Sequence, residues 1–467
     1  MMKKFLKICL AFMMVFAISF GAEQSRAEQS RAEQSDPWQR IKEIQNEALS
    51  SLNKYNDETD EESEAGAEEN TFLQVRDVDA WEAIGQLEEK IAFDPEPYGL
   101  PVLYLAGDTS AMSKDTAVDL AYVCGERSGV CSVKWQGSSS LSYPKKNYTI
   151  KFDNAFEAKT GWGEQKKYCF KANFIDHSHS RNVVSCKLWG EIVKSRSNVP
   201  AELATLPNGG AIDGFPCVIM LNGEFHGLYT WNIPKDGWMF GSPKAILCAD
   251  AHTDATRFKG LATLNGDFEL EYVEDENNAD WVLPSINRAI QAVMDSDGSD
   301  LDTNINQYID IASAIDYYIH TVDEAAADAT DKNYILVTFD GVKWYFSAYD
   351  RDTVYGLEWT GKMFYAPNVG TTYKSYANMH RLMELIYNYK RKELKDRAVS
   401  LRKTVKSEAN VTNVFTNFAS GIPSQILIED AQKWPTIPST NTSNIWQILN
   451  WYRLRREMLD AEIDSWN

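Results

Sequence analysis

Two clusters of carboxylate and amide side chains lie close together in the C-terminal half of the sequence. The first is DATDKNY at 328–334, in which Asp328 and Asn333 have the spacing D-x-x-x-x-N. The second is YDRD at 349–352. Carboxylates grouped in this way repel one another, so a cation usually lies between them. Hard oxygen ligands of this kind suit Mg²⁺, which binds one or two carboxylates together with phosphate oxygens.

A predicted β-hairpin joins the two clusters. YILVTF at 334–339 and VKWYFSAY at 342–349 flank Asp-Gly, which is a dipeptide typical of two-residue hairpin turns. Such a turn places Asp350 opposite Asp331, and facing residues on paired strands lie about 5 Å apart. The hairpin therefore predicts that Asp328, Asn333 and Asp350 meet at one end, although Asp and Asn are also common in ordinary loops.

The order of these residues fits the pattern of protein kinases. In that pattern a metal-binding asparagine follows the catalytic aspartate, and a second metal-binding aspartate comes further along. Asp328 would be the catalytic residue, and Asn333 and Asp350 the metal ligands. The apolar spacing at 309–320 predicts the helix that should precede them. A rival interpretation takes DRD as the D-x-D motif of a nucleotide-sugar transferase, but no doubly wound α/β pattern surrounds it.

A stretch rich in serine provides a second set of candidate phosphate ligands. Gly137 lets the backbone turn freely, and it is followed by Ser138, Ser139 and Ser140. The hydroxyl and N–H groups of these serines could contact phosphate oxygens. The alternative is a plain surface turn, which the motifs further along the chain make the weaker interpretation.

Kinases also place a lysine on the phosphates, usually paired with a glutamate on a helix. Lys146 follows the serine-rich stretch and is our first choice. Lys171 is the alternative, because it lies on a predicted strand 20 residues before Glu191 on the predicted helix 180–193. Arg181, at the start of that helix, would bind phosphate or pair with a nearby acid. Either lysine could instead be a solvated strand residue.

Several stretches together resemble the CotH kinase family, the spore-coat protein H group of atypical secreted protein kinases. They are WQGSSS at 135–140 with YPKKNY at 143–148, Ala172-Asn173 with Asp176 and Arg181-Asn182, LNGEFHGLY at 221–229, and the set Asp328, Asn333, Asp350 and Asp352. The resemblance extends from about residue 100 to the C-terminal helix. Gln136 departs from it, since the family often has arginine there.

This resemblance implies a fold, cofactors and partners. The fold would be an atypical protein-kinase-like, two-lobed α+β fold that binds ATP with Mg²⁺ or Mn²⁺. Its activity would be transfer of phosphate to Ser or Thr hydroxyls of protein substrates, Ser-rich ones in particular. By position, the resemblance makes Asp328 the catalytic aspartate and Asp350 the metal-binding one, with Asn333 and Asp352 as further residues of the metal site. AMP transfer on the same fold and a catalytically silent surface or adhesion module are the alternatives.

The N-terminal segment predicts export. Three lysines at positions 3, 4 and 7 precede an apolar run at 8–20 and then small residues, which is the layout of a secretory signal peptide over 1–21. An uncleaved membrane anchor is the alternative, but the run is shorter than the ~20 residues of a spanning helix. No later segment is long and apolar enough to cross a bilayer. We therefore expect a secreted or cell-surface protein.

The sequence then divides into a spacer and two lobes. Residues 22–70 contain AEQS repeats, a predicted helix at 36–54 and an acidic run, and they are expected to form a low-complexity spacer. A β-rich N-lobe is expected over 71–235 and a mostly helical C-lobe over 236–467, with the kinase-like domain from about 100. The net charge of −20 argues against a nucleic-acid partner.

Short apolar runs bounded by turn residues predict the strands, and apolar residues at helical spacing predict the helices. Cys124 and Cys131 flank a turn and could form a bridge across it. The predicted strands, besides the hairpin, are 100–105, 117–124, 129–135, 147–152, 167–174, 216–221 and 224–231. The predicted helices, besides 180–193 and 309–320, are 280–294, 390–406 and 445–466.

Overall fold

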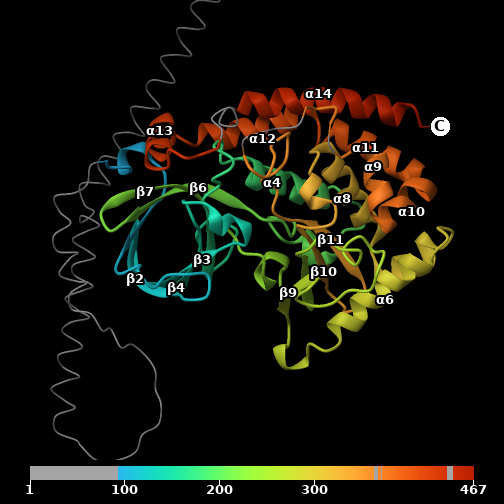
Figure 1. Cartoon of the computed structure of the whole chain (residues 1–467), viewed down its shortest axis with the longest axis horizontal. Helices are drawn as coiled ribbons and strands as arrows, with labels where there is room; N and C mark the ends of the chain where they lie inside the picture. Colours follow the sequence, from blue (N-terminus) through green and yellow to red (C-terminus); the bar gives the residue numbers. More distant parts are fainter. Residues whose placement is uncertain (1–92, 362–365, 370, 439–444, 467) are drawn as a thin grey trace, which may run out of the picture.

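A computed structural model of the chain describes residues 93–361, 366–369, 371–438 and 445–466. The predicted signal peptide, the spacer with its helix at 36–54 and the first part of the predicted N-lobe lie outside the described residues. Within them the fold is α+β, with a β-rich N-terminal part and a helical C-terminal part (Figure 1).

The N-terminal part is a closed barrel of seven strands in the order β1-β2-β3-β4-β5-β7-β6. Neighbouring strands are antiparallel except β1 and β6, which run parallel. Asn222 and Gly223 have positive φ in the turn between β6 and β7, as a tight hairpin turn requires. The predicted strands of this part are confirmed, except that the one predicted at 167–174 ends at Lys171. The bounds are β1 (Val102–Ala106), β2 (Val118–Cys124), β3 (Arg127–Gln136), β4 (Asn147–Phe156), β5 (Gln165–Lys171), β6 (Gly214–Leu221) and β7 (Glu224–Asn232).

A second sheet of four strands, in the order β11-β10-β8-β9, lies in the C-terminal part. The hairpin β10–β11 was predicted, but β8 and β9 were not, and the chain after 236 was expected to be mostly helical. All five residues of β8 are buried, and a short run of this kind has no periodicity that separates a strand from a buried helix. The bounds are β8 (Ala245–Ala249), β9 (Phe268–Val273), β10 (Tyr334–Thr338) and β11 (Trp344–Ala348).

The pairing within the hairpin differs from the prediction by one residue. Tyr334 pairs with Ala348, so the strands end before Asp350 and the predicted pair of Asp350 with Asp331 is wrong. The reason lies in the turn, where Asp340 Oδ1 accepts hydrogen bonds from the N–H groups of residues 342 and 343. This local hydrogen bonding by an aspartate stabilises a loop longer than two residues.

In the view of Figure 1 the helices lie above and to the right of the four-stranded sheet, and the C-terminal helix α14 lies along the outside of them. The helices predicted within the described residues are present, and their ends differ by at most three residues from the prediction. Trp189 on α4 donates to Ser347 of β11 at 3.0 Å, which fixes α4 against the hairpin. The bounds are α4 (Arg181–Lys194), α5 (Ala201–Ala204), α6 (Val282–Asp295), α7 (Asn306–Tyr308), α8 (Ile311–Asp323), α9 (Tyr373–Met379), α10 (Arg381–Tyr389), α11 (Arg391–Lys403), α12 (Glu408–Ser420), α13 (Ser424–Lys433) and α14 (Ile445–Asp464).

The expected bridge between Cys124 and Cys131 is not formed. All six cysteines in the described part of the chain are free. The antiparallel pairing of β2 with β3 places Cys131 opposite Leu120, four residues from Cys124 along β2. Burial raises the pKa of the Cys131 thiol, which behaves as a small core residue.

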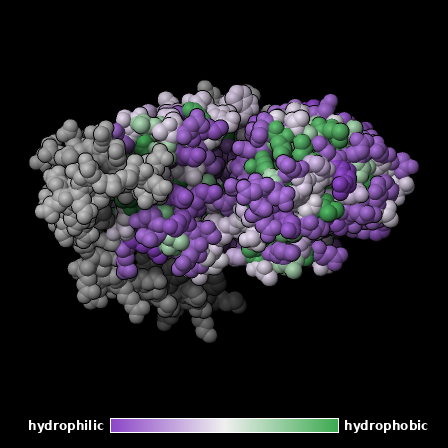
Figure 2. All heavy atoms as spheres, turned by 90° about the horizontal axis from the view of Figure 1, so that it is seen from below, coloured by the Kyte–Doolittle hydropathy of each residue, from purple (hydrophilic) through white to green (hydrophobic). Residues whose placement is uncertain are grey.

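The surface is polar on the face that Figure 2 shows, where hydrophobic residues occur in small groups among hydrophilic ones. None of the helices within the described ranges is both long and apolar enough to span a bilayer.

A buried ion pair attaches α13 to the barrel. Lys145, which follows the serine-rich stretch, places its Nζ 2.7 Å from Asp430 Oδ1 on α13, and both side chains are fully buried. Asp430 also accepts the N–H of Leu228 on β7 at 2.8 Å. Burial by itself would raise the pKa of Asp430, but Lys145 and His179 lower it below its usual value. The charged form of Asp430 therefore stabilises the fold.

Replacing Asp430 with alanine is expected to lower the free energy of unfolding by about 3–5 kcal/mol, because it leaves the Lys145 ammonium buried without its partner. Because the pKa of Asp430 is lower in the folded protein, its contribution is fully present above the unfolded pKa of about 3.9 and is lost progressively as the pH falls from there through the lower folded pKa. Urea titration at pH 7 and at pH 3 measures both effects.

The neighbouring Glu429 supplies a matched control for this variant. It bonds Gln425 one turn away on α13, so Glu429→Ala is expected to cost less than about 1 kcal/mol. The double change Lys145→Met with Asp430→Leu removes both charges and should recover most of the loss. Equal stability of the Asp430→Ala and Glu429→Ala proteins would show that the buried pair does not hold α13.

Candidate active site

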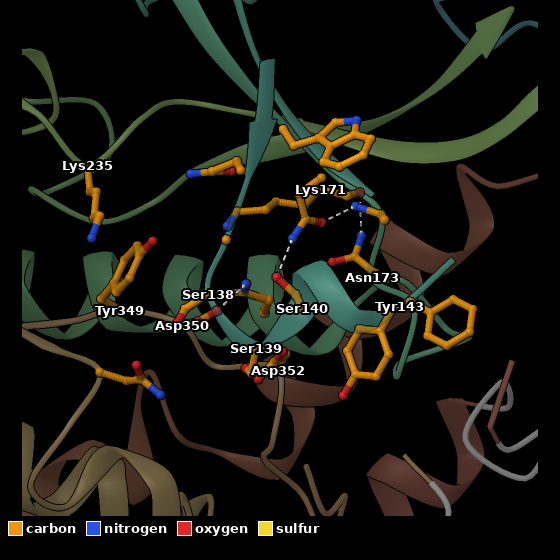
Figure 3. Close-up of a pocket in the computed structure, with 18 of the residues that line it drawn as sticks. Ser138, Ser139, Ser140, Tyr143, Lys171, Asn173, Lys235, Tyr349, Asp350 and Asp352 are labelled. Atoms are coloured by element: carbon orange, nitrogen blue, oxygen red, sulfur yellow. Dashed lines mark hydrogen bonds between the residues drawn. The ribbon is translucent and has the colours of Figure 1, made fainter. Parts of the chain in front are cut away.

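A cavity of about 510 Å³ opens between one end of the barrel and the four-stranded sheet. The end of β3 with the loop after it, β5 and the two ends of the β10–β11 hairpin form its walls. Figure 3 shows the serines of that loop and the aspartates of the hairpin facing the same space. The predicted site residues that line the cavity are Gly137, Ser138, Ser139, Ser140, Lys171, Asp328, Asn333, Asp350 and Asp352.

The two ends of the hairpin bring the acidic clusters together as the sequence predicted, through turns rather than through strand pairing. Asn333 precedes β10 and donates from Nδ2 to Asp328 Oδ2 at 2.7 Å. Asn333 and Asp350 both have φ near +50°, a left-handed conformation that asparagine and aspartate tolerate better than most residues. The chain can therefore turn sharply at both ends, so that both side chains face the cavity.

Helix α4 holds the far end of the hairpin. Asn182, in its first turn, accepts the N–H of Arg351 at 3.1 Å and lies 3.4 Å from Asp350 Oδ1 through its Nδ2. Arg351 is itself buried, with its guanidinium 4.9 Å from the ring of Tyr317 on α8. Both aspartates of the DRD motif therefore flank a residue that is anchored in the core.

The carboxylates of this cluster repel one another. Burial raises the pKa of Asp352 well above its usual value, and the nearby charges of Asp350 and Asp328 raise it further. Lys171 has the opposite effect on Asp352. The pKa of Asp328 is also raised, first by burial and then by Asp350, whereas His252 lowers it. A further cation in the cavity would therefore stabilise the charged carboxylates.

These residues fit a divalent cation that is shared with phosphate. Asp350 and Asp352 supply carboxylate oxygens and Asn333 an amide oxygen, and all three residues line the cavity. Within the described part of the chain, no group of three or more His, Cys, Asp or Glu side chains could hold a metal ion. Mg²⁺ is usually bound by one or two carboxylates, with phosphate and water completing its ligands, so the donor set is suitable.

The serine-rich loop lines the same cavity. Gly137 has φ of +128°, and a Cβ there would overlap the Oγ of Ser140, so the turn requires glycine. Asn147 on β4 supports the loop, since its Nδ2 lies 3.3 Å from Ser140 Oγ and its Oδ1 accepts the N–H of Ala172 at 2.7 Å. These bonds tie the loop to the end of β5, next to Lys171.

Replacing Gly137 with alanine is expected to displace this loop. The positive φ and the overlap with Ser140 together should cost about 1–3 kcal/mol of local strain, which moving the serines would relieve. If the loop contacts phosphate, the KM for a phosphate-bearing substrate should rise about 10-fold or more, because 1.4 kcal/mol changes a binding constant tenfold. Steady-state kinetics with varied concentrations of that substrate measures this change.

Gly163 provides the matched control for this substitution. It also has positive φ, at +76°, but a Cβ added to it would have no other atom within 4 Å. Gly163→Ala should lose stability through its backbone alone and keep the KM of the parent protein. A Gly137→Ala protein with unchanged KM would exclude the loop from nucleotide binding.

The structure favours Lys171 over Lys146 as the lysine of the cavity. Lys171 lines the cavity, whereas the Nζ of Lys146 donates to the carbonyl oxygens of Leu141 and Tyr143 and so closes the serine-rich turn from outside. Our first choice from the sequence, Lys146, therefore does not lie at the site. Its place in the motif indicated proximity to the loop but not the direction of its side chain.

The expected partner of Lys171 lies elsewhere. Glu191 accepts a hydrogen bond from Asn410 on α12 at 2.9 Å, and among the ion pairs of the described residues none joins it to Lys171. Lys171 instead interacts electrostatically with Asp352. The interval of 20 residues between strand lysine and helix glutamate was therefore misleading, because the α4 face that carries Glu191 packs toward α12.

Arg181 is a structural residue rather than a phosphate ligand. Its side chain is fully buried, its Nη1 lies 2.6 Å from Asp176 Oδ1, and its Nε donates to the carbonyl oxygen of Val354 at 3.1 Å. The alternative that Arg181 pairs with a nearby acid is therefore the correct one. This pair fixes the start of α4 and, through it, Asn182.

Gln136 lies at the cavity wall, at the position where the family often has arginine. Its Nε2 lies 3.5 Å from Cys169 Sγ on β5. Its Oε1 is buried, and no hydrogen-bond partner for it occurs among the described residues. Gln136 therefore brings no positive charge to the cavity, and Lys171 is the cation beside Asp352.

Further residues in and beside the cavity were not predicted from the sequence. Lys235, between β7 and β8, lies over the ring of Tyr349 with its Nζ 4.9 Å from the centroid, and both residues line the cavity (Figure 3). His252, in the loop after β8, contacts Asp328 at the edge of the site. Because β8 itself was not predicted, no sequence signal connected either segment with the hairpin.

Comparison with known proteins identifies the family. The chain matches the family model described as CotH kinase protein over residues 133–233 and 242–459. A search of curated proteins finds no match. The matched ranges include the serine-rich loop, Lys171 and both ends of the hairpin, and they cover more than half of the chain. The protein therefore belongs to the CotH kinase family.

Proposed function

We propose that the protein is a secreted protein kinase that transfers the γ-phosphate of ATP to Ser or Thr hydroxyls of protein substrates. One observation carries this proposal. Asp328, Asn333, Asp350 and Asp352 line one cavity together with the serine-rich loop and Lys171. This combination supplies a base, oxygen ligands for a divalent cation and groups that bind phosphate, which are the parts that phosphoryl transfer needs.

Each residue would have a distinct role. Asp350, Asp352 and Asn333 would hold Mg²⁺ or Mn²⁺, which when bound neutralises the charge of the phosphates. The N–H and hydroxyl groups of the serine-rich loop would bind phosphate oxygens, and Lys171 would pair with the phosphates rather than with Glu191. Asp328, with its Oδ2 held by Asn333, would orient the substrate hydroxyl. Catalysis would come mainly from positioning and charge stabilisation.

The transfer step breaks the bond between the γ-phosphorus and the oxygen it shares with the β-phosphate. A new bond forms between the γ-phosphorus and the Ser or Thr oxygen, and the hydroxyl proton goes to Asp328. ADP leaves with the electron pair of the broken bond. Asp328 only has to accept one proton and align one oxygen, so a carboxylate held in place at the cavity edge is sufficient.

The arrangement of the chain supports a kinase-like, two-lobed fold. The barrel would act as the N-lobe and the helices with the four-stranded sheet as the C-lobe, and the cavity lies where the two parts meet. A ligand site between two such parts is common in proteins. The family match spans both parts, from β3 to α14.

The proposal that the kinase is secreted rests on the N-terminal sequence. The charged start, apolar run and small residues at 1–21 are those of a cleaved signal peptide. N-terminal sequencing of the protein recovered from its native host would test this, since cleavage near residue 21 is expected. An N-terminus at Met1 would exclude it.

Transfer of radiolabel tests the enzymatic proposal. Purified protein is incubated with Mn²⁺, a Ser-rich protein substrate and either γ-labelled or α-labelled ATP. We expect protein-bound label only from γ-labelled ATP, in an acid-stable form that is recovered as phosphoserine or phosphothreonine. Label from α-labelled ATP would instead establish AMP transfer, and label from neither would favour a silent module.

A further inference from the structure

His252 is the exposed histidine of this chain, and it lies beside the proposed catalytic aspartate. The other five histidines are buried or half-buried. His252 belongs to the loop that leaves β8, where the carbonyl oxygen of Ala249 accepts the N–H of Asn333 at 2.9 Å. This bond places the loop next to the start of the hairpin.

The imidazole bridges two carboxylates. Its Nε2 lies 3.3 Å from Asp328 Oδ1, and its Nδ1 lies 2.8 Å from Asp331 Oδ1. Asn333 occupies the other oxygen of Asp328 at 2.7 Å. Both oxygens of Asp328 therefore have a partner, one on each side, and these contacts define the plane of its carboxylate.

Asp331, the second partner of His252, is itself held by neighbouring groups. Asp331 is almost fully buried, and its Oδ2 accepts a hydrogen bond from Arg257 Nε at 2.7 Å. Arg257 lies five residues after His252 in the same loop, and Thr256 Oγ1 donates to the carbonyl oxygen of Ala251 at 2.8 Å. Hydrogen bonds thus link the loop, Asp331 and the start of the hairpin. Those between charged groups are the stronger ones.

We propose that His252 is a positioning residue that orients the carboxylate of Asp328 for the substrate hydroxyl. This inference rests on the proposed kinase function. A carboxylate oxygen only accepts hydrogen bonds, so a ring that binds both carboxylates must carry a proton on each nitrogen. In this imidazolium form Nδ1 donates to Asp331, and Nε2 forms the ion pair with Asp328. The geometry is that of a base oriented by a second group, which is itself oriented by a third.

Exposure separates this role from a structural one. Half of the His252 side chain is accessible, at 49%, whereas Asp331 is 3% exposed. Substitution of an exposed loop residue usually changes stability little. Loss of a residue that orients an active-site group commonly reduces activity by about 10–100-fold. Activity and stability should therefore respond differently to the loss of the ring.

The test measures phosphate transfer by His252→Ala, His252→Gln and the control Asp254→Ala. Asp254 lies two residues further along the same loop, and its side chain is 76% exposed. We expect kcat of His252→Ala to fall about 10–100-fold while the KM for ATP stays within about twofold. Added imidazole, which can enter the exposed position, should restore at least a few-fold of the lost kcat. Asp254→Ala should match the parent protein.

Rescue by added imidazole distinguishes a positioning role of His252 from a role in folding. A His252→Ala protein with the parent kcat would overturn the inference and leave the proposed function intact. A fall in kcat without rescue by imidazole, accompanied by a lower Tm, would show a structural role and also overturn it. If His252→Ala does not fold, His252→Gln provides the same comparison, because its amide can replace one donor and should retain part of the activity. A parent protein that transfers no phosphate would overturn both proposals.

Discussion

Replacing Asp350 with asparagine is expected to reduce phosphate transfer by about 1,000-fold or more. The change removes one negative charge from the proposed metal site, and a bound metal contributes several kcal/mol to transition-state stabilisation in such sites. Asparagine also tolerates the positive φ of this position, so the turn after β11 should be kept. Kinetics with varied Mn²⁺ and ATP should show that both bind more weakly.

An exposed aspartate on a helix provides the control for this variant. Asp396 on α11 pairs with Lys392 one turn away, and its side chain is 62% exposed. The change Asp396→Asn should leave transfer and metal dependence at the parent values. Transfer by Asp350→Asn at the parent rate and with the parent metal dependence would contradict the assignment of Asp350 as a metal ligand.

The change Asp328→Asn is expected to reduce kcat by about 100- to 10,000-fold, which is the usual contribution of a positioned general base. The amide has nearly the shape of the carboxylate but accepts no proton at neutral pH. Because Asp328 lies outside the proposed metal ligands, the affinity for the metal and for ATP should change little. The two aspartate variants therefore separate a defect in proton transfer from a defect in metal binding.

Calorimetric titration of Mn²⁺ and ATP into the Asp328→Asn protein measures whether the affinities for the metal and for ATP are kept. Binding should be close to that of the parent protein, although Asp328→Asn transfers almost no phosphate. A protein that binds normally and transfers at the parent rate would exclude Asp328 as the base. Weak binding would instead show that Asp328 takes part in holding the metal.

The sequence predicted the centre of the site because the site is local. The hairpin between Asp328 and Asp352 is a continuous segment, and its turn and its two acidic ends can be recognised without knowledge of the rest of the fold. The one-residue error in the predicted strand pairing did not affect the predicted site, since the acidic residues lie in turns beyond the strands. The barrel strands were also predictable, because turn residues lie at their ends.

The parts that the sequence did not predict depend on contacts between distant residues. The pair of Lys145 with Asp430 joins positions 285 residues apart, and nothing near either residue indicates the other. The direction of Lys146 and the packing of Glu191 are set by tertiary contacts that spacing does not contain. His252 follows β8, which was not predicted because its short buried run shows no strand or helix periodicity. The contact of His252 with Asp328 could therefore only be seen in the structure.

Anomalous diffraction from crystals grown with Mn²⁺ and a non-hydrolysable ATP analogue tests the central claim most directly. The account predicts a manganese peak within coordination distance of Asp350 and Asp352 oxygens, with phosphate oxygens of the analogue completing the ligands and the serine-rich loop over them. Crystals of Asp350→Asn grown in the same way should lose the peak. A manganese ion or nucleotide bound elsewhere, with the hairpin aspartates free of both, would contradict it.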